Sequence, residues 1–157
     1  MPIYMKIQGI EGESHSEEYR NWFDVFSFSW GETNPASTGG GGGGGAGRVN
    51  MADFAIMKRA SKGSPALFLA CATGRHFSRA DIVVTRFASE EEQVFEHFVL
   101  SDVLITRYDI SGDAGDIPTD GCSINFRKIE FTQMYQGSDG QLFSQTNWFD
   151  QRNGRGG

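Results

Sequence analysis

The sequence has little cysteine and no long apolar segment. Its two cysteines, Cys71 and Cys122, are too few for a disulfide framework and lack the paired spacing of a zinc site. They are typical of a protein that folds in a reducing cytoplasm. No run approaches the roughly 20 apolar residues of a membrane-spanning helix, so we expect no membrane insertion. Residues 1–8 lack the basic start and the apolar block of a signal peptide.

Positive charge is also scarce. The 157 residues hold 14 Lys and Arg against 20 Asp and Glu, a net charge of −6, and no basic stripe, which excludes a nucleic-acid binder. By contrast, 13 Phe, three Trp and four Tyr supply ample apolar area, which excludes a disordered chain. A chain of this length buries about two-thirds of its surface in one core. We therefore expect one domain over residues 1–157, with no metal or cofactor needed for stability.

Alternation of apolar and polar side chains predicts a mainly β fold. Strands are expected over residues 1–8, 24–30, 48–58, 77–87, 93–108, 122–135 and 142–149. In the second of these, Phe26, Phe28 and Trp30 share one parity, which predicts that they face the core. Residues 32–48 hold seven consecutive glycines, which predicts a loop. Such a loop is either flexible on the surface or ordered by a partner, because glycine loses the most entropy on ordering.

One short helix is expected after the third strand. Ser64 is predicted as its N-cap, Pro65 as its first helical residue, and Gly74 marks its end. The apolar residues between them recur at helical spacing and are expected to form one stripe on a sheet: Leu67, Phe68, Cys71 and Ala72.

Two of the long strands carry apolar residues on both parities. In residues 93–108 the two sets are Phe98, Leu100 and Leu104 against Val99, Val103 and Ile105. A closed antiparallel barrel covers only its inner face, so the outer set is expected to meet the helix, a lumen or another subunit. We take Val99, Val103 and Ile105 as candidate subunit contacts.

The strand over residues 122–135 changes phase at Arg127 and Lys128. Its apolar residues are even-numbered before this point and odd-numbered after it. The change predicts either a bulge or a strand that crosses between two buried faces. Arg127 and Lys128 are further candidates for subunit contacts.

None of the motifs that carry chemistry is complete. The glycine run lacks the Gly-Lys-Ser/Thr ending of a phosphate-binding loop, since Arg48 opens a strand instead. Cys71 lies on the apolar stripe of the helix, where a free cysteine behaves as a small hydrophobe, so a pair with His76 is not expected. His15 and His97 are too scattered to complete a metal site. The sequence therefore predicts no catalytic residue and no metal.

Two acidic segments, residues 90–92 and 111–118, lie between strands. Both are predicted to be solvated turns, and the alternative for the first is pairing across a subunit contact. The second has three aspartates but not the ligand order of an EF-hand, so a plain loop is expected.

Several short motifs occur in a fixed order along the chain. They are Ser29-Trp30-Gly31, the glycine run into Gly47-Arg48-Val49, Ser64-Pro65, Cys71-Ala72-Thr73-Gly74-Arg75-His76 and Ile124-Asn125-Phe126-Arg127-Lys128-Ile129-Glu130. Together they resemble the Hcp family, the haemolysin-coregulated proteins that form the inner tube of type VI secretion systems. The resemblance runs from Ile3 to about Asp139.

This resemblance implies a compact β-barrel of two antiparallel sheets, with one short helix on its side and an extended glycine-rich loop. It implies a structural protein, not an enzyme, that forms hexameric rings. The rings would stack into a tube that is fired with a spike protein and works with a contractile sheath and a baseplate. The loop would serve ring stacking, with Thr38, Gly39, Gly41, Gly43, Gly47 and Arg48 as candidate contacts.

The resemblance also implies a route and a cargo. The protein would be cytoplasmic before assembly and would then leave through the type VI system without a signal peptide. Small effectors could be carried in the lumen of the ring. The polar segment after Asn147 leaves no room for a fused toxin domain, so none is expected.

A second hypothesis comes from a different class of protein. A carbohydrate-binding β-sandwich would use exposed aromatic side chains such as Trp22, Trp30 or Trp148 as a stacking platform. Size in solution separates the two hypotheses, because a glycan binder can be monomeric whereas a tube protein forms a ring.

Overall fold

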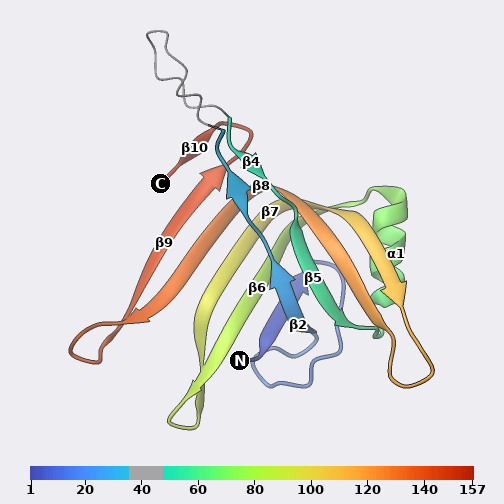
Figure 1. Ribbon diagram of the computed structural model, residues 1–157, viewed down its shortest axis with the longest axis horizontal. Coiled ribbons are helices and arrows are strands. Elements are labelled where there is room, and N and C mark those ends of the chain that lie inside the picture. The colour runs from blue at the N-terminus through green and yellow to red at the C-terminus, as the bar shows by residue number, and fades with distance from the viewer. Residues whose placement is uncertain (36–47) are drawn as a thin grey trace.

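Residues 1–35 and 48–157 are described by this computed structural model, and they form ten β-strands and one α-helix (Figure 1). The elements are β1 (Ile3–Ile7), β2 (Phe23–Ser29), β3 (Glu32–Thr33), β4 (Asn50–Met51), β5 (Phe54–Arg59), α1 (Ser64–Thr73), β6 (His76–Ala88), β7 (Glu91–Ser111), β8 (Thr119–Gln136), β9 (Leu142–Asp150) and β10 (Arg155–Gly156). In this part of the chain no helix has both the length and the apolar character needed to cross a membrane.

Six of the strands close into a barrel. Their order is β8–β5–β2–β1–β6–β7, and β7 pairs back onto β8 to complete the circle. β9 and β10 continue the sheet beyond β8, and α1 packs at the side of the barrel against β7 (Figure 1). The expected mainly β barrel with one short helix is confirmed.

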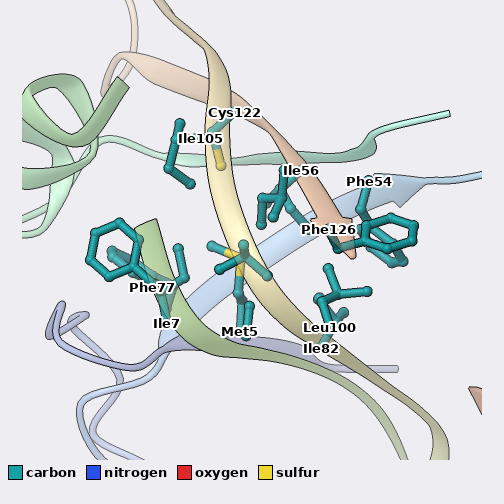
Figure 2. Packing of buried hydrophobic residues seen from close by; sticks show 14 of the residues in the cluster. Met5, Ile7, Phe54, Ile56, Phe77, Ile82, Leu100, Ile105, Cys122 and Phe126 are labelled. Atoms are coloured by element: carbon teal, nitrogen blue, oxygen red, sulfur yellow. The ribbon is translucent and has the colours of Figure 1, made fainter. Parts of the chain in front are cut away.

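The barrel interior is filled by apolar side chains from all six strands. Figure 2 shows Met5, Phe54, Ile82 and Leu100 pointing into this common core. Phe98 links its aromatic members, because its ring stacks on Phe131 at a centroid distance of 4.7 Å and meets the Phe54 ring edge-on at 5.1 Å.

β7 and β8 change the parity of their buried residues at the same level of the barrel. On β7, Leu100 and Val103 both face the core, and between them Asp102 has a positive φ of 55°. Aspartate tolerates this left-handed conformation better than most residues. The left-handed residue rotates the strand, so that odd-numbered side chains face the core after it and even-numbered ones before it. The register is the same on both sides of this point, with Leu100 opposite Ile129 and Val103 opposite Phe126.

This shared phase change corrects two expectations. No register shift occurs at Arg127 and Lys128, so the predicted bulge there is wrong; the shift in this pairing lies between Ile105 and Arg107. The two expected apolar sets of β7 also do not match its two faces, because the inward parity changes at Asp102. Phe98 and Leu100 before Asp102 and Val103 and Ile105 after it face the core, whereas Val99 and Leu104 are only half-buried. Figure 2 shows Leu100 and Ile105 in the same interior.

The second strand departs from the expected parity for a similar reason. Its register with β5 shifts between Val25 and Ser27, which inserts one residue and reverses the faces. Phe23 and Val25 are therefore buried, whereas Phe26 is exposed. The expected inward position of Phe26 is wrong, while Phe28 packs against the core as predicted.

Several element boundaries also differ from the sequence expectation. The strand expected over residues 48–58 is divided into β4 and β5, and β4 pairs with β3 inside the segment expected to be a loop. The short strand β10 was not expected at all, because it is held by pairing with β9 and has no apolar alternation of its own.

The first acidic segment is only partly a turn. Glu91 and Glu92 begin β7, and Glu92 Oε1 accepts hydrogen bonds from the Tyr4 hydroxyl at 3.0 Å and from the Thr85 hydroxyl at 2.6 Å. Burial, followed by the bond to Glu92, raises the pKa of Tyr4 to about 12. Glu92 therefore joins β1, β6 and β7 and is not a freely solvated side chain.

Helix α1 begins and ends close to the predicted residues, but its faces differ. Gly63 is the N-cap, and Ser64 is the first helical residue without a capping bond to the helix. Gly74 ends the helix with a φ of 66°, as expected. The buried residues are Ser64, Leu67 and Ala70, whereas Phe68 and Leu69 are exposed. The expected stripe is thus correct at Leu67 and wrong at Phe68.

A buried ion pair anchors the start of α1 to the barrel. Lys58 Nζ on β5 lies 2.9 Å from Asp120 Oδ1 on β8, with side chains 1% and 0% exposed. Ser64 donates a hydrogen bond to Asp120 Oδ2 at 2.6 Å, and the Tyr108 hydroxyl donates to the same oxygen at 2.8 Å. The Lys58 ammonium also lies 4.9 Å from the ring centre of Phe23. Three strands and the helix therefore meet at one carboxylate.

We predict that breaking this pair is costly, because it leaves a buried charge without a partner. Asp120→Ala should lower the free energy of unfolding by about 3–5 kcal/mol. The double variant Lys58→Met with Asp120→Leu removes both charges and should lose less. Urea denaturation measures both changes.

The matched control is the exposed pair of Lys62 with Glu11, whose side chains are 53% and 73% exposed. Glu11→Gln should change stability by less than about 1 kcal/mol. An effect of Asp120→Ala no larger than this control would contradict the anchoring role.

Candidate assembly surfaces

The candidate stacking loop lies almost entirely outside the described residues. Thr38, Gly39, Gly41, Gly43 and Gly47 all fall within residues 36–47. Their proposed role rests on the sequence alone.

Arg48 is the one loop candidate that the structure describes. Its side chain is exposed, and the residue lines a groove next to the short β3–β4 pair.

Of the candidate subunit contacts, Val103 and Ile105 are incorrect. Both are buried in the core of the chain itself, at 0% and 2% exposure, so they have no surface to offer a neighbour. Val99 is half-buried and points out of the barrel, opposite Asp81 on β6 and Glu130 on β8. Val99 stays a prediction.

Arg127 and Lys128 both lie beside β9. The Arg127 guanidinium pairs with Asp150 at 3.1 Å, and the Lys128 ammonium lies 4.7 Å from the ring centre of Trp148. Each cation is therefore engaged within the chain, although Arg127 and Lys128 keep partial exposure. Their part in subunit contacts stays a prediction.

A polar cluster next to Val99 went unnoticed in the sequence. Asp81 accepts two hydrogen bonds from Arg79, at 2.7 and 2.8 Å, and lies 2.8 Å from His97 Nε2. Burial favours the neutral acid, but the bonds to Arg79 and His97 outweigh it and lower the pKa of Asp81 to about 2. The strand register brings these residues together, and no spacing along the sequence could have indicated the cluster.

A groove of about 970 Å³ lies between the short β3–β4 pair and the end of β9 that follows Asn147. Its apolar lining includes Trp30, Ile129, Phe131 and Phe149. Trp30 is fixed there, because its indole nitrogen donates to the carbonyl of Ala52 at 2.9 Å. The charged lining residues are Glu32, Arg48 and Arg152.

Helix α1 presents a second apolar surface. None of its ten residues is charged, and Phe68 and Leu69 are each 58% exposed. A helix that is apolar all round is normally covered on every side. In this chain the barrel covers only the side that carries Leu67 and Ala70.

The three tryptophans do not form a common platform for a sugar. Trp22 packs edge-on against Tyr19 at 5.1 Å in a separate cluster with Tyr4. Trp30 and Trp148 both line the groove, but Trp30 is half-buried. The Lys128 ammonium lies over the ring of Trp148 and occupies the face on which a sugar would stack. This arrangement gives no support to the carbohydrate-binding hypothesis.

The two free cysteines differ in burial. Cys71 is half-buried on α1, and His76 lies 3.5 Å from Asp102. Cys122 lies in the core beside Ile105 (Figure 2), where burial raises the pKa of its thiol to about 12. Within residues 1–35 and 48–157 no cluster of His, Cys, Asp and Glu could hold a metal ion.

Comparison with known proteins decides the family. The family described as "Type VI secretion system effector, Hcp" matches residues 4–133. Protein hcp1 of Pseudomonas aeruginosa is 31% identical over 139 residues, which cover 88% of this chain and 86% of that protein. The chain belongs to the Hcp family. It is therefore a secreted tube protein of the type VI secretion system and belongs to a structural, non-enzymatic family.

Solved structures agree with this Hcp assignment at the level of the fold. A type six secretion system protein superposes with a TM-score of 0.90 at 20% identity, covering 99% of both chains. Hcp1 from Salmonella typhimurium superposes with a TM-score of 0.81 at 22% identity, covering 99% of this Hcp chain and 97% of its own.

The burial of Cys122 in this Hcp chain leads to a test of the core. In a Cys71→Ala variant Cys122 is the only thiol left. Burial raises the pKa of the Cys122 thiol to about 12, so the thiolate, which is the reacting form, is scarce at pH 8. We expect no labelling by a thiol reagent at pH 8 until the protein is unfolded. Rapid labelling of the folded variant would show that the barrel opens there.

Proposed function

We propose that this Hcp chain forms hexameric rings and that the rings stack head to tail into the inner tube of a type VI secretion system. The observation that carries the proposal is the uncharged outer side of α1, where Phe68 and Leu69 are exposed, together with a groove beside β9 that has a mixed apolar and polar lining. Large exposed apolar patches mark interaction sites in soluble proteins. The family assignment supports the same assembly.

Symmetry supplies the mechanism. A contact between two different surfaces of identical subunits is head to tail, and it closes into a ring when the rotation permits. A second such contact along the ring axis does not close, so it propagates as a tube. The glycine-rich loop is our candidate for this second contact, since backbone without side chains can approach a neighbouring ring closely.

The other partners follow from the same proposal. The spike protein would cap the tube, and the contractile sheath and the baseplate would surround and seat it. Small effectors would bind in the lumen, where binding to the folded state stabilises cargo and ring by mass action. The chain would be made in the cytoplasm and leave through the system that it builds, with no signal peptide.

Sedimentation velocity tests the ring. At micromolar concentration we expect a species of about six times the 17.3 kDa chain mass. The carbohydrate-binding alternative predicts a monomer. A 17.3 kDa species alone across the concentration range would contradict the proposal.

Bulky residues in the glycine run test the stacking contact. We expect Gly41→Trp with Gly43→Trp to preserve single rings but to reduce tube formation and secretion, because the indoles obstruct close approach. Replacing part of the run by a short linker should leave the melting temperature nearly unchanged. Electron microscopy of the double variant decides: normal tubes would exclude a stacking role, and loss of the rings would place the loop at a different interface.

A further inference from the structure

The outer side of α1 and the groove beside β9 are complementary in shape, and both carry apolar side chains, with Glu32, Arg48 and Arg152 also in the groove lining. Phe68 and Leu69 project from a convex helix without any charge. The groove is concave, and Trp30, Phe131 and Phe149 contribute to its apolar lining. Removing the apolar side chains of both surfaces from water would lower the free energy of the assembly.

The two surfaces lie on different sides of the molecule. In Figure 1, α1 stands at one side of the barrel, while β9 and β10 stand at the other. Because α1 is packed on β7 and anchored through Ser64, it cannot reach the groove of its own chain. A helix that fills the groove must therefore come from another molecule.

The sizes also agree. A helix with side chains is about 11 Å across and rises 5.4 Å per turn, so one turn fills on the order of 500 Å³. The groove of about 970 Å³ thus has about the volume of two whole turns, which is enough for the outer half of α1. The ten residues of α1 make nearly three turns, and Phe68 and Leu69 lie in the middle of them.

We infer that α1 of one subunit docks in the groove of the next subunit and that this contact closes the ring. The inference rests on the proposed function and names the surfaces that it uses. Each subunit offers its helix on one side and its groove on the other, so the contact is heterologous and both surfaces are used once per subunit. The apolar residues that the barrel leaves exposed on α1 become buried between subunits.

Paired variants test the helix side. Phe68→Ser with Leu69→Ser changes exposed side chains, so the fold should persist, with an unchanged circular dichroism spectrum and melting behaviour of the subunit. Loss of their burial should raise the protein concentration needed for ring formation at least about tenfold. The matched control is Phe87→Ser, which alters an equally exposed phenylalanine, 64% exposed, on the β6–β7 hairpin. The control should assemble like the unmodified chain.

Cysteine pairs test the groove side without weakening the contact. In a Cys71→Ala background, Leu69→Cys is combined with Asn147→Cys, an exposed β9 residue in the groove lining. Mild oxidation should give a ladder of disulfide-linked subunits that ends at the ring. The control pair combines Leu69→Cys with Ser138→Cys, an exposed residue at the tip of the β8–β9 turn. This pair should give no disulfide-linked subunits.

The outcomes separate the inference from the proposed function. If the unmodified chain is only monomeric, the proposed ring fails and this contact fails with it. If the unmodified chain forms rings but the helix variants assemble equally well, or the groove cysteine pair does not link, the ring stands and this contact is wrong. Equal loss of assembly in Phe87→Ser would also overturn it, because the effect would not be specific to α1.

Discussion

The pairing of β7 with β8 is the constraint on which the rest of the structure depends. These two strands run together from Ser111 and Thr119 to Glu96 and Gln133, and their pairing closes six strands into one barrel. Closure fixes a single interior, so the inward parity of β7 must change along the strand, from Leu100 to Val103. The left-handed residue Asp102 makes this turn without changing the register.

Closure also decides what remains outside. β8 is longer than the closed part of the barrel, and its far end carries β9 as an added strand. Phe131 packs against the core through Phe98 and also lines the groove, and Phe149 on β9 lines the same groove. On the side of β7, the ion pair of Lys58 with Asp120 holds α1 so that Phe68 and Leu69 face outward. The exposed apolar side of α1 and the mixed groove beside β9 are therefore consequences of how the barrel closes.

Much of the fold could be predicted from local patterns. Alternation located the long strands, and Pro65 with Gly74 located the helix, because each signal depends on residues close together in the sequence. The faces were harder to predict. A bulge after Val25 and the left-handed Asp102 each reverse a parity, and neither has a reliable sequence signal. For this reason the sequence places Phe26 inside and Ile105 at a subunit contact. In the structure Phe26 is exposed and Ile105 is buried in the core.

The candidate surfaces depended even more on register. The cluster of Asp81 with His97 and the groove around Trp30 join residues that are far apart in the sequence, so only the folded sheet brings them together. The electron cryo-microscopy density of the assembled protein tests our central claim most directly. We predict density for α1 of each subunit inside the groove of its neighbour around the whole ring. A ring in which Phe68 and Leu69 face solvent or the lumen would contradict the account.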